Sequence, residues 1–188
     1  MAIKPILFNT EMVRAILDGR KTVTRRLVKF LSRKNPNWTG YVKDGLMLYN
    51  GRNEPCIKKA PYQLGDILYV RESYSELSFG YVYKADGENI DHLGNVIKWH
   101  PSIHMPKEAA RIWLKVTDVR VERLQEMWAS DASKEGLQFN KPTTANEMLQ
   151  AFAELWNSTI KKSDLDRHGW DANPWVWVIE FERCEKPE

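Results

Sequence analysis

The sequence predicts an α+β fold within a single domain. Short runs of β-branched and aromatic residues recur along the chain, and two segments, near residues 15 and 150, instead repeat apolar residues at helical spacing. A strand, a helix, several strands, further helices and a closing strand follow one another. This grouped order favours α+β. At 188 residues the chain is large enough for one hydrophobic core.

The first elements are a strand and a helix. The apolar run 3–8 contains Pro5, which lacks a backbone donor, so this strand is expected at a sheet edge. Residues 10–18 carry four apolar side chains on one helical face, Met12, Val13, Ile16 and Leu17. Asn9 or Thr10 can cap the start of this helix, and Gly19 suits the left-handed residue after its end.

The middle of the chain contains an expected insertion and several strands. Turn-forming residues dominate segment 32–60, which is expected to be a lightly ordered insertion with one hairpin strand at 46–49. Further strands are expected at 67–72, at 81–83 and over 110–124. The last of these changes its alternation near Thr117 and Asp118, which predicts a local register shift.

The last third is expected to be helical before a closing strand. Residues 124–136 indicate two helical turns, with Ser130 or Asp131 as a cap and Gly136 at the end. Thr144 and Glu147 have the spacing of a capping box for the helix that follows. Segment 140–170 is expected to be a second insertion. The apolar run 175–181 predicts a central strand.

A basic corner follows the first helix. The stretch Gly19–Arg26 holds four cationic side chains and two hydroxyls, and its Thr-Val-Thr run predicts the start of a strand. Such a run can be a solvated face, or an anion site that uses Lys21, Arg25 and Arg26. Lys21 and Thr24 are three residues apart, so both reach one pocket only if the chain bends between them.

The corner also resembles a family signature. Gly19, Lys21, Thr24 and Arg26 match the pattern G-x-K-x-x-E-x-R of ASCH domains (activating signal cointegrator homology), except that Thr24 replaces Glu. The threonine form is similar to bacterial N-acetylcytidine amidohydrolases, and the wider chain resembles phage and prophage members. The resemblance implies a PUA-like small β-barrel flanked by helices. By local alignment it also implies that Glu135 completes a site with Lys21 and Thr24.

Two functions follow from the resemblance. The first is a binding module that recognises RNA or a modified nucleoside in a basic cleft, with phosphate on the corner and tryptophan faces on the base. The second is a hydrolase. It would be either an amide hydrolase that uses Lys21, Thr24 and Glu135, or a ribonuclease. Contact of Lys21 with both Thr24 and a carboxylate would favour the amide hydrolase.

Other candidate ligand-binding residues lie outside the corner. Glu72 ends a strand and can balance the corner cations or act as a base when desolvated. Ser102 and His104 lie in a proline-broken segment that can line a pocket, and Arg111 follows it closely. Three residues before and in the last strand can form a stacking and hydrogen-bonding wall: Trp170, Asn173 and Trp175.

Composition narrows the remaining possibilities. A net charge of +3 does not demand a nucleic-acid partner, although basic residues gather between residues 14 and 34. His100 and His104 are separated by Pro101, and no metal site or cofactor is expected. Two cysteines, no evident secretory signal and no membrane-spanning apolar run lead us to expect a cytoplasmic protein with free thiols.

Overall fold

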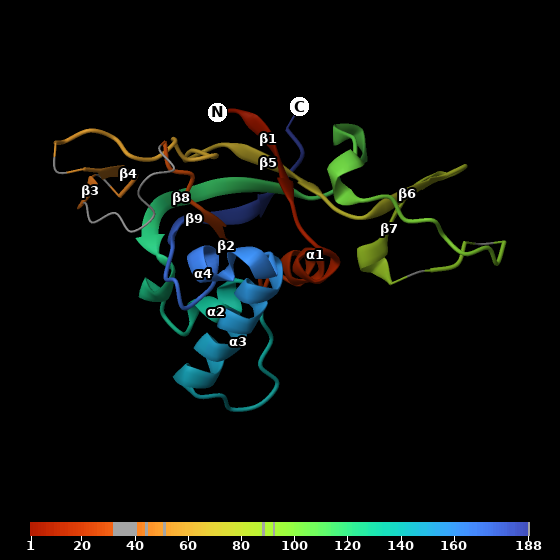
Figure 1. Ribbon diagram of the computed structural model, residues 1–188. Coiled ribbons are helices and arrows are strands. Elements are labelled where there is room, and N and C mark those ends of the chain that lie inside the picture. Colours follow the sequence, from red (N-terminus) through yellow and green to blue (C-terminus); the bar gives the residue numbers. More distant parts are fainter. Residues whose placement is uncertain (32–40, 44, 51, 88, 92, 188) are drawn as a thin grey trace.

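The centre of the computed structural model is a five-stranded sheet. The structure describes residues 1–31, 41–43, 45–50, 52–87, 89–91 and 93–187. The strand order is β1-β5-β8-β9-β2 (Figure 1). The bounds are β1 Ile3–Leu7, β5 Ile67–Arg71, β8 Trp113–Arg123, β9 Trp175–Cys184 and β2 Val23–Leu27. Among these five described strands only β1 and β5 pair in parallel, so the predicted α+β class is confirmed.

The sheet has two free edges, β1 and β2. No backbone pairing joins these two strands in the described ranges, so the closed barrel implied by the resemblance is not observed there. A side chain crosses between the edges instead, because Arg26 Nη2 donates to the carbonyl oxygen of Leu7 at 2.9 Å. The position of β1 at an edge agrees with the prediction from Pro5.

The helix after β1 has the predicted caps. It is α1, Thr10–Leu17, and the side chain of Asn9 accepts a hydrogen bond from the backbone N–H of Met12 at 2.9 Å. Gly19 follows with φ +75°, the left-handed conformation that glycine adopts without strain. The chain therefore turns sharply from α1 towards β2.

The two faces of β9 pack into different hydrophobic clusters. Trp177, Ile179 and Phe181 join a cluster that contains residues of α1, β1, β5 and β8. Val176 and Val178 pack instead with Phe152 and Trp156 of α3, Ala145–Thr159. Burial on both faces confirms the prediction that the last strand is central.

The helices α2, α3 and α4 gather on one side of the sheet (Figure 1). α3 begins with the predicted capping box of Thr144 and Glu147. The short α2, Asp131–Lys134, follows a 3-10 turn at Leu124–Glu126 and ends before Gly136, which has φ +103°. The prediction that a side chain caps α2 is wrong. Ser130 makes no capping hydrogen bond, and the carboxylate of Asp131 is turned towards Arg25.

The long strand β8 contains the predicted irregularity. Its register against β9 shifts between Val116 and Asp118, where the apolar alternation of the sequence also changes. Because side chains alternate between faces, the shift lets Val116 and Val119 both join the cluster around α1.

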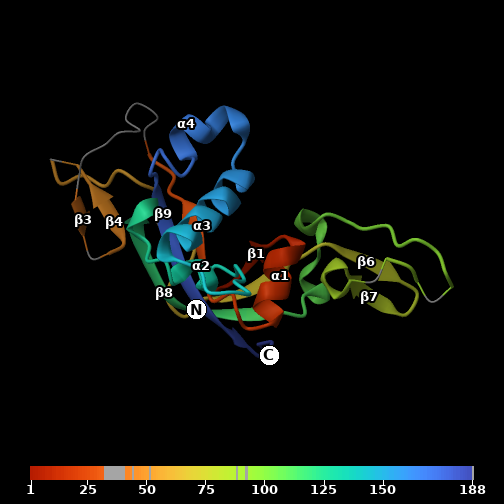
Figure 2. The same cartoon turned by 90° about the horizontal axis from the view of Figure 1, so that it is seen from below.

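Two small hairpins extend from opposite ends of the sheet (Figures 1 and 2). One pairs β3, Tyr41–Lys43, with β4, Met47–Tyr49. It belongs to the expected insertion 32–60, of which residues 32–40, 44 and 51 lie outside the described part. The other pairs β6, Tyr74–Leu77, with β7, Gly80–Tyr83. The second expected insertion, 140–170, holds α3 and also the short helix α4, which spans Leu165–His168.

Both cysteines, Cys56 and Cys184, are free thiols, as predicted. Within the described ranges, no helix combines the length and the apolar character needed to cross a membrane.

Candidate functional site

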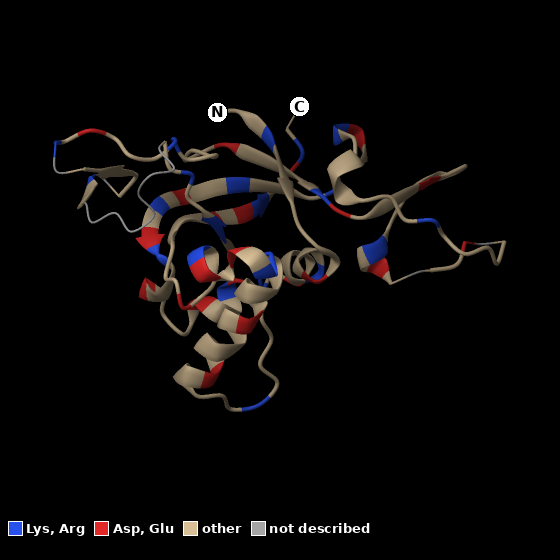
Figure 3. Ribbon diagram, viewed as in Figure 1, with Lys and Arg blue, Asp and Glu red and all other residues tan. Residues whose placement is uncertain are grey.

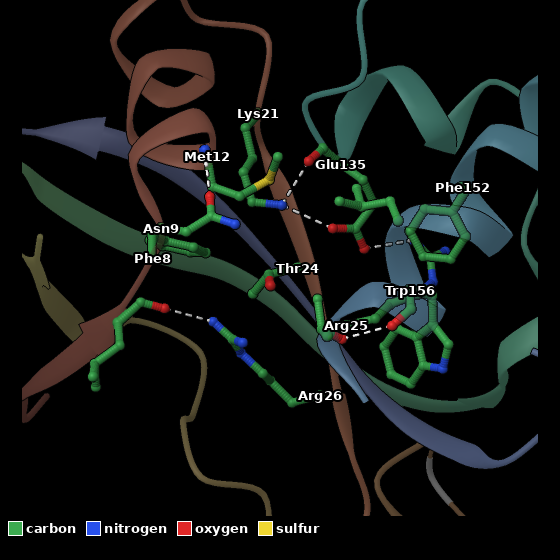
Figure 4. A pocket seen from close by; sticks show the side chains of 13 residues that line it. Phe8, Asn9, Met12, Lys21, Thr24, Arg25, Arg26, Glu135, Phe152 and Trp156 are labelled. Atoms are coloured by element: carbon green, nitrogen blue, oxygen red, sulfur yellow. Dashed lines mark hydrogen bonds and ion pairs between the residues drawn. The ribbon is translucent and has the colours of Figure 1, made fainter. Parts of the chain in front are cut away.

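A pocket lies between the edge strands β1 and β2, which we call the edge pocket (Figure 4). Its volume is about 110 Å³. That is several times the ~30 Å³ share of a water molecule and below the ~300 Å³ at which drug-sized sites begin. It therefore has room for a single small group. Its lining includes Leu7, Phe8, Asn9, Met12, Lys21, Thr24, Arg25, Arg26, Glu135, Phe152, Leu155, Trp156 and Thr159.

The edge position explains why consecutive residues of β2 all reach this pocket. Side chains alternate between the two faces of a strand. Thr24 and Arg26 pair with Ile179 and Trp177 on the face that packs against α1, whereas Arg25 extends on the α3 face. At a free edge both faces border the same opening, so Lys21 and Thr24 both line this pocket despite the three-residue spacing between them.

Lys21 is buried and completely hydrogen-bonded. Its Nζ donates to the carboxylate of Glu135 at 2.8 Å, to the backbone carbonyl of Glu135 at 2.7 Å and to that of Val23 at 2.8 Å. An ammonium group has three donors, and here all three are used. Lys21 therefore has no donor left for an anion unless one of these bonds breaks.

The ion pair continues through Arg25 to a second acid. Arg25 Nη1 lies 3.1 Å from the other carboxylate oxygen of Glu135, and Nη2 lies 3.1 Å from Asp131. All four residues are less than a tenth exposed. Two cations and two carboxylates thus neutralise one another inside the protein, a buried chain that we call the ion-pair relay.

Burial and ion pairing oppose one another at Lys21. Desolvation lowers the pKa of Lys21 below its ordinary value, while Glu135 opposes this shift and the nearby Arg26 and Arg25 add to it. At Asp131 desolvation raises the pKa, but Lys134 and Arg25 outweigh it and hold the pKa below the usual range. The relay therefore keeps Asp131 ionised and places Lys21 where its proton is more easily lost.

The backbone after α2 brings Glu135 to Lys21. The N–H of Thr22 donates to the carbonyl of Lys134 at 2.9 Å, and a side-chain donor of Arg20 bonds the carbonyl of Gly136. Gly136 lies so close to α1 that an added Cβ would be 2.8 Å from Cβ of Ala15 and 3.3 Å from Cβ of Lys21. Only glycine fits this close approach without displacement.

Thr24 contributes an uncommitted hydroxyl to the edge pocket. The residue is 4% exposed, and its hydroxyl makes no hydrogen bond within the ranges that the structure describes. Because Thr24 lines the pocket, its hydroxyl can donate to or accept from a bound group. Lys21 contacts a carboxylate inside a pocket but not Thr24, so the contact expected of an amide hydrolase is only partly present.

Arg26 is the corner cation that remains without a carboxylate. In the described part of the chain its guanidinium donates only to Leu7 and lies over the ring of Phe8, 5.4 Å from the centroid. Of the three cations predicted to hold an anion, Lys21 and Arg25 are already neutralised within the protein, and only Arg26 keeps unpaired charge.

Glu72 lies in a different place from the corner. Its carboxylate accepts from Arg111 at 3.0 and 3.1 Å, and Arg111 also bonds Asp86. The expectation that Glu72 balances the corner cations is wrong, because Glu135 and Asp131 do so. Burial raises the pKa of Glu72, which Arg111 opposes. The Arg111 guanidinium stacks on Tyr83 at 3.9 Å, so this cluster braces the β6–β7 hairpin.

The segment around Ser102 and His104 does not reach the edge pocket. It forms a 3-10 turn, His104 is exposed, and the His104 carbonyl accepts from the hydroxyl of Tyr74 at 3.2 Å. Arg111 lies with Glu72, as described above. The structure therefore does not bring Ser102, His104 and Arg111 together with the corner.

The expected wall of Trp170, Asn173 and Trp175 is divided among three contacts. The ring of Trp170 meets Phe152, 6.0 Å between centroids, and the side chain of Asn173 accepts from the N–H of Gln125 at 2.9 Å. Trp175 packs under the guanidinium of Arg123 at 4.4 Å and borders a separate cavity. None of the three lines the edge pocket.

Several pocket residues carry little signal in the sequence. Phe152 and Trp156 belong to the apolar face of α3, and the sequence marks Asp131 only as a candidate helix cap. Asn9 and Phe8 carry a usable signal, because they lie directly before the helix that leads into the basic corner. Acidic and basic positions are otherwise interspersed over the fold (Figure 3).

No metal centre is formed by the residues with described positions, where no group of three or more His, Cys, Asp or Glu is placed to hold an ion. The site is instead a polar pocket at a sheet edge with a buried ion-pair relay in its wall.

Comparison with known proteins finds only distant structural similarity. No family model matches the chain, and no curated protein matches it. A solved ASCH domain from Lactobacillus crispatus JV V101 is 12% identical, over 97% of this chain and 79% of that chain, with a TM-score of 0.38. A protein of Enterococcus faecalis V583 from the family DUF984 is 11% identical, over 98% and 76%, with a TM-score of 0.43.

Proposed function

We propose that the protein binds a nucleotide, free or within RNA, and recognises its base in the edge pocket. The observation that carries this proposal is the uncommitted hydroxyl of Thr24 in a small pocket with aromatic walls. Base-recognition pockets combine aromatic faces with a few hydrogen-bonding groups at the edge of the base. Phe8 and Trp156 supply apolar wall, and Thr24 supplies a donor and acceptor.

The neutralised relay supports a base rather than a phosphate as the occupant. Lys21 and Arg25 already have carboxylate partners, so a phosphate placed there would compete with Glu135 and Asp131. A neutral heterocycle needs no such exchange. The carboxylate oxygens of Glu135 have lone pairs left after one bond each from Lys21 and Arg25, and these can accept from an exocyclic amine.

The test is the binding of nucleoside monophosphates and of a short single-stranded RNA by calorimetry and by fluorescence anisotropy. Thr24→Val removes the hydroxyl while keeping the shape of the side chain. We expect it to weaken binding about five- to tenfold, the value of one hydrogen bond. Thr22→Val is the control, because Thr22 is exposed and does not line the pocket. Equal affinity of the two variants would contradict the proposal.

The second candidate is amide hydrolysis at the same pocket, as the resemblance implies for Lys21, Thr24 and Glu135. Two observations favour it: burial lowers the pKa of Lys21, and the hydroxyl of Thr24 is free to react. In this reaction Thr24 Oγ attacks the amide carbon as its proton passes to neutral Lys21. The amine leaves with the proton that Lys21 took up, and water then cleaves the ester on Thr24, which releases the carboxylic acid and restores the hydroxyl.

Conversion of N-acetylcytidine to cytidine separates this candidate from binding alone. Chromatography follows the reaction for the wild type, Thr24→Val and Lys21→Met. If the site is a hydrolase, the wild type converts the substrate and the two variants do not. Absence of conversion at high enzyme concentration, together with retained nucleotide binding, would exclude this reaction and leave the binding function. Incubation of the same RNA, followed by gel electrophoresis, tests the ribonuclease alternative.

A further inference from the structure

A second hollow borders the edge pocket at Arg26. We call it the cationic groove. It shares Arg26 with the edge pocket and has a volume of about 420 Å³. Its lining is Arg26, Leu27, Lys29, Lys58, Lys59, Pro61, Tyr62 and Trp177. Four of these eight residues are cationic and none is acidic.

The cations of this groove come from two segments that the backbone holds together. The N–H of Lys58 donates to the carbonyl of Lys29 at 2.8 Å, and the N–H of Leu31 donates to the carbonyl of Cys56 at 2.9 Å. Phe30 and Ile57 form an antiparallel bridge between them. The buried side chain of Ile57 anchors this contact in the core. Like charges are thus held side by side by the fold itself.

These charges have no carboxylate partner. Over the described ranges, Arg26, Lys29, Lys58 and Lys59 form no ion pair, whereas Lys21 and Arg25 a few residues earlier are paired. Lys59 also borders an adjoining hollow that contains Asp118, and this carboxylate is bound to Arg120 at 2.7 Å. Mutually repelling cations in one groove create a local positive potential that a polyanion would relieve.

The small size of the edge pocket also indicates that a bound nucleotide extends beyond it. At about 110 Å³ it can enclose one small group, so the remainder of a nucleotide must lie outside it. The cationic groove borders the edge pocket at Arg26 and can receive this remainder. The half-buried ring of Tyr62 forms part of its wall and is available to a sugar or a second base.

We propose that the cationic groove holds the phosphodiester backbone of a single-stranded nucleic acid, one nucleotide of which inserts its base into the edge pocket. The strand must be single because a base in a duplex is stacked and paired and cannot enter a pocket. The inference rests on the proposed nucleotide binding and extends it. The ligand is a polynucleotide, and its backbone is held by Lys29, Lys58 and Lys59.

The test is the salt dependence of binding to fluorescein-labelled single-stranded 12-mers, RNA and DNA of one sequence. The variant is the triple substitution Lys29→Gln/Lys58→Gln/Lys59→Gln. All three lysines are exposed in the protein. Loss of three phosphate contacts should reduce the slope of log K against log salt by about 2, at ~0.7 per contact for single strands. At low salt we expect affinity for the better-bound 12-mer to fall at least tenfold.

The matched control removes three exposed lysines elsewhere, Lys141→Gln/Lys161→Gln/Lys162→Gln. Both variants carry the same net charge, so only the position of the charge differs. Circular dichroism checks that each remains folded. An equal loss of affinity in both variants would mean a general charge effect and would overturn the proposal. Binding of inorganic polyphosphate as tight as that of the 12-mer would overturn it too.

Nucleoside monophosphate binding distinguishes this proposal from the underlying one. If the groove variant binds both the monophosphate and the 12-mer as the wild type does, the groove proposal fails and nucleotide binding at the edge pocket stands. If the wild type binds neither ligand, the proposed function itself fails. Both proposals are supported if the groove variant binds the monophosphate as the wild type does and shows the reduced salt slope for the 12-mer.

Discussion

Arg26 on β2 donates a hydrogen bond from Nη2 to the backbone carbonyl of Leu7 on β1, at 2.9 Å. The two strands are the opposite edges of the sheet. One side chain therefore spans the opening in which the edge pocket lies.

Replacement of Arg26 by Met should loosen β1. A hydrogen bond from a charged donor to a backbone carbonyl contributes about 1–2 kcal/mol, and Met keeps most of the apolar stem. We expect a loss of that size in urea unfolding and faster hydrogen exchange of the β1 amides. Lys29→Met is the control, because this exposed residue spans no gap. Equal losses would mean that the bridge contributes nothing.

Substitution of Gly136 by Ala should be more costly than that of other left-handed glycines. At Gly136 an added Cβ meets Ala15 at 2.8 Å, whereas at Gly65, with φ +81°, it meets nothing within 4 Å. Gly65→Ala should cost about 1–2 kcal/mol from backbone strain alone. Gly136→Ala should cost about 1–3 kcal/mol more, from overpacking. Because it displaces the chain beside Glu135, nucleotide binding should also weaken in the Gly136 variant only.

The pair Lys21 and Glu135 should be strongly coupled. Breaking a buried ion pair by removing one partner costs about 3–5 kcal/mol. We expect Lys21→Met and Glu135→Gln each to approach that loss, and the double variant to lose at least 1 kcal/mol less than their sum. The exposed pair of Arg14 and Glu11, at 2.9 Å, is the reference cycle and should couple by less than about 1 kcal/mol. Additive losses at Lys21 and Glu135 would refute the coupling.

Stability should depend on alkaline pH through Lys21. Burial lowers the pKa of Lys21 in the folded chain below 10.5, so between the two values the unfolded chain binds more protons at this position. The free energy of unfolding contributed by Lys21 is therefore lowest below the folded pKa and rises with pH towards 10.5.

Urea unfolding of the wild type and Lys21→Met between pH 7 and 10 measures this effect, since other titrating groups cancel in the difference. The wild type should gain stability relative to the variant as pH rises. A difference that stays flat or falls would show that Glu135 outweighs the desolvation of Lys21.

Local signals in the sequence predicted much of the fold. The Asn9 cap, the capping box of Thr144 and Glu147, and the shift near Asp118 each depend on a few adjacent residues, and each is confirmed. β6 was not predicted, because its Tyr-Ser-Glu-Leu run is too short to show a period.

The site was less accessible to sequence reasoning because its contacts are distant along the chain. Arg25 and Asp131 are 106 positions apart, and nothing local distinguishes Asp131 from a helix cap. Glu135 was placed beside Lys21 only through the resemblance. Glu72 could not be assigned to Arg111 rather than to the corner, since both partners are plausible until the sheet order is known.

The two unpaired edges also bear on how the protein behaves at high concentration. A free strand edge exposes backbone groups that can pair with another copy of the chain. Here β1 and β2 are only five residues long, Pro5 removes a donor from one, and the other carries Arg25 and Arg26. Short, proline-containing or charged edges oppose strand addition. The opening that holds the edge pocket is thus also protected against self-assembly into extended sheets.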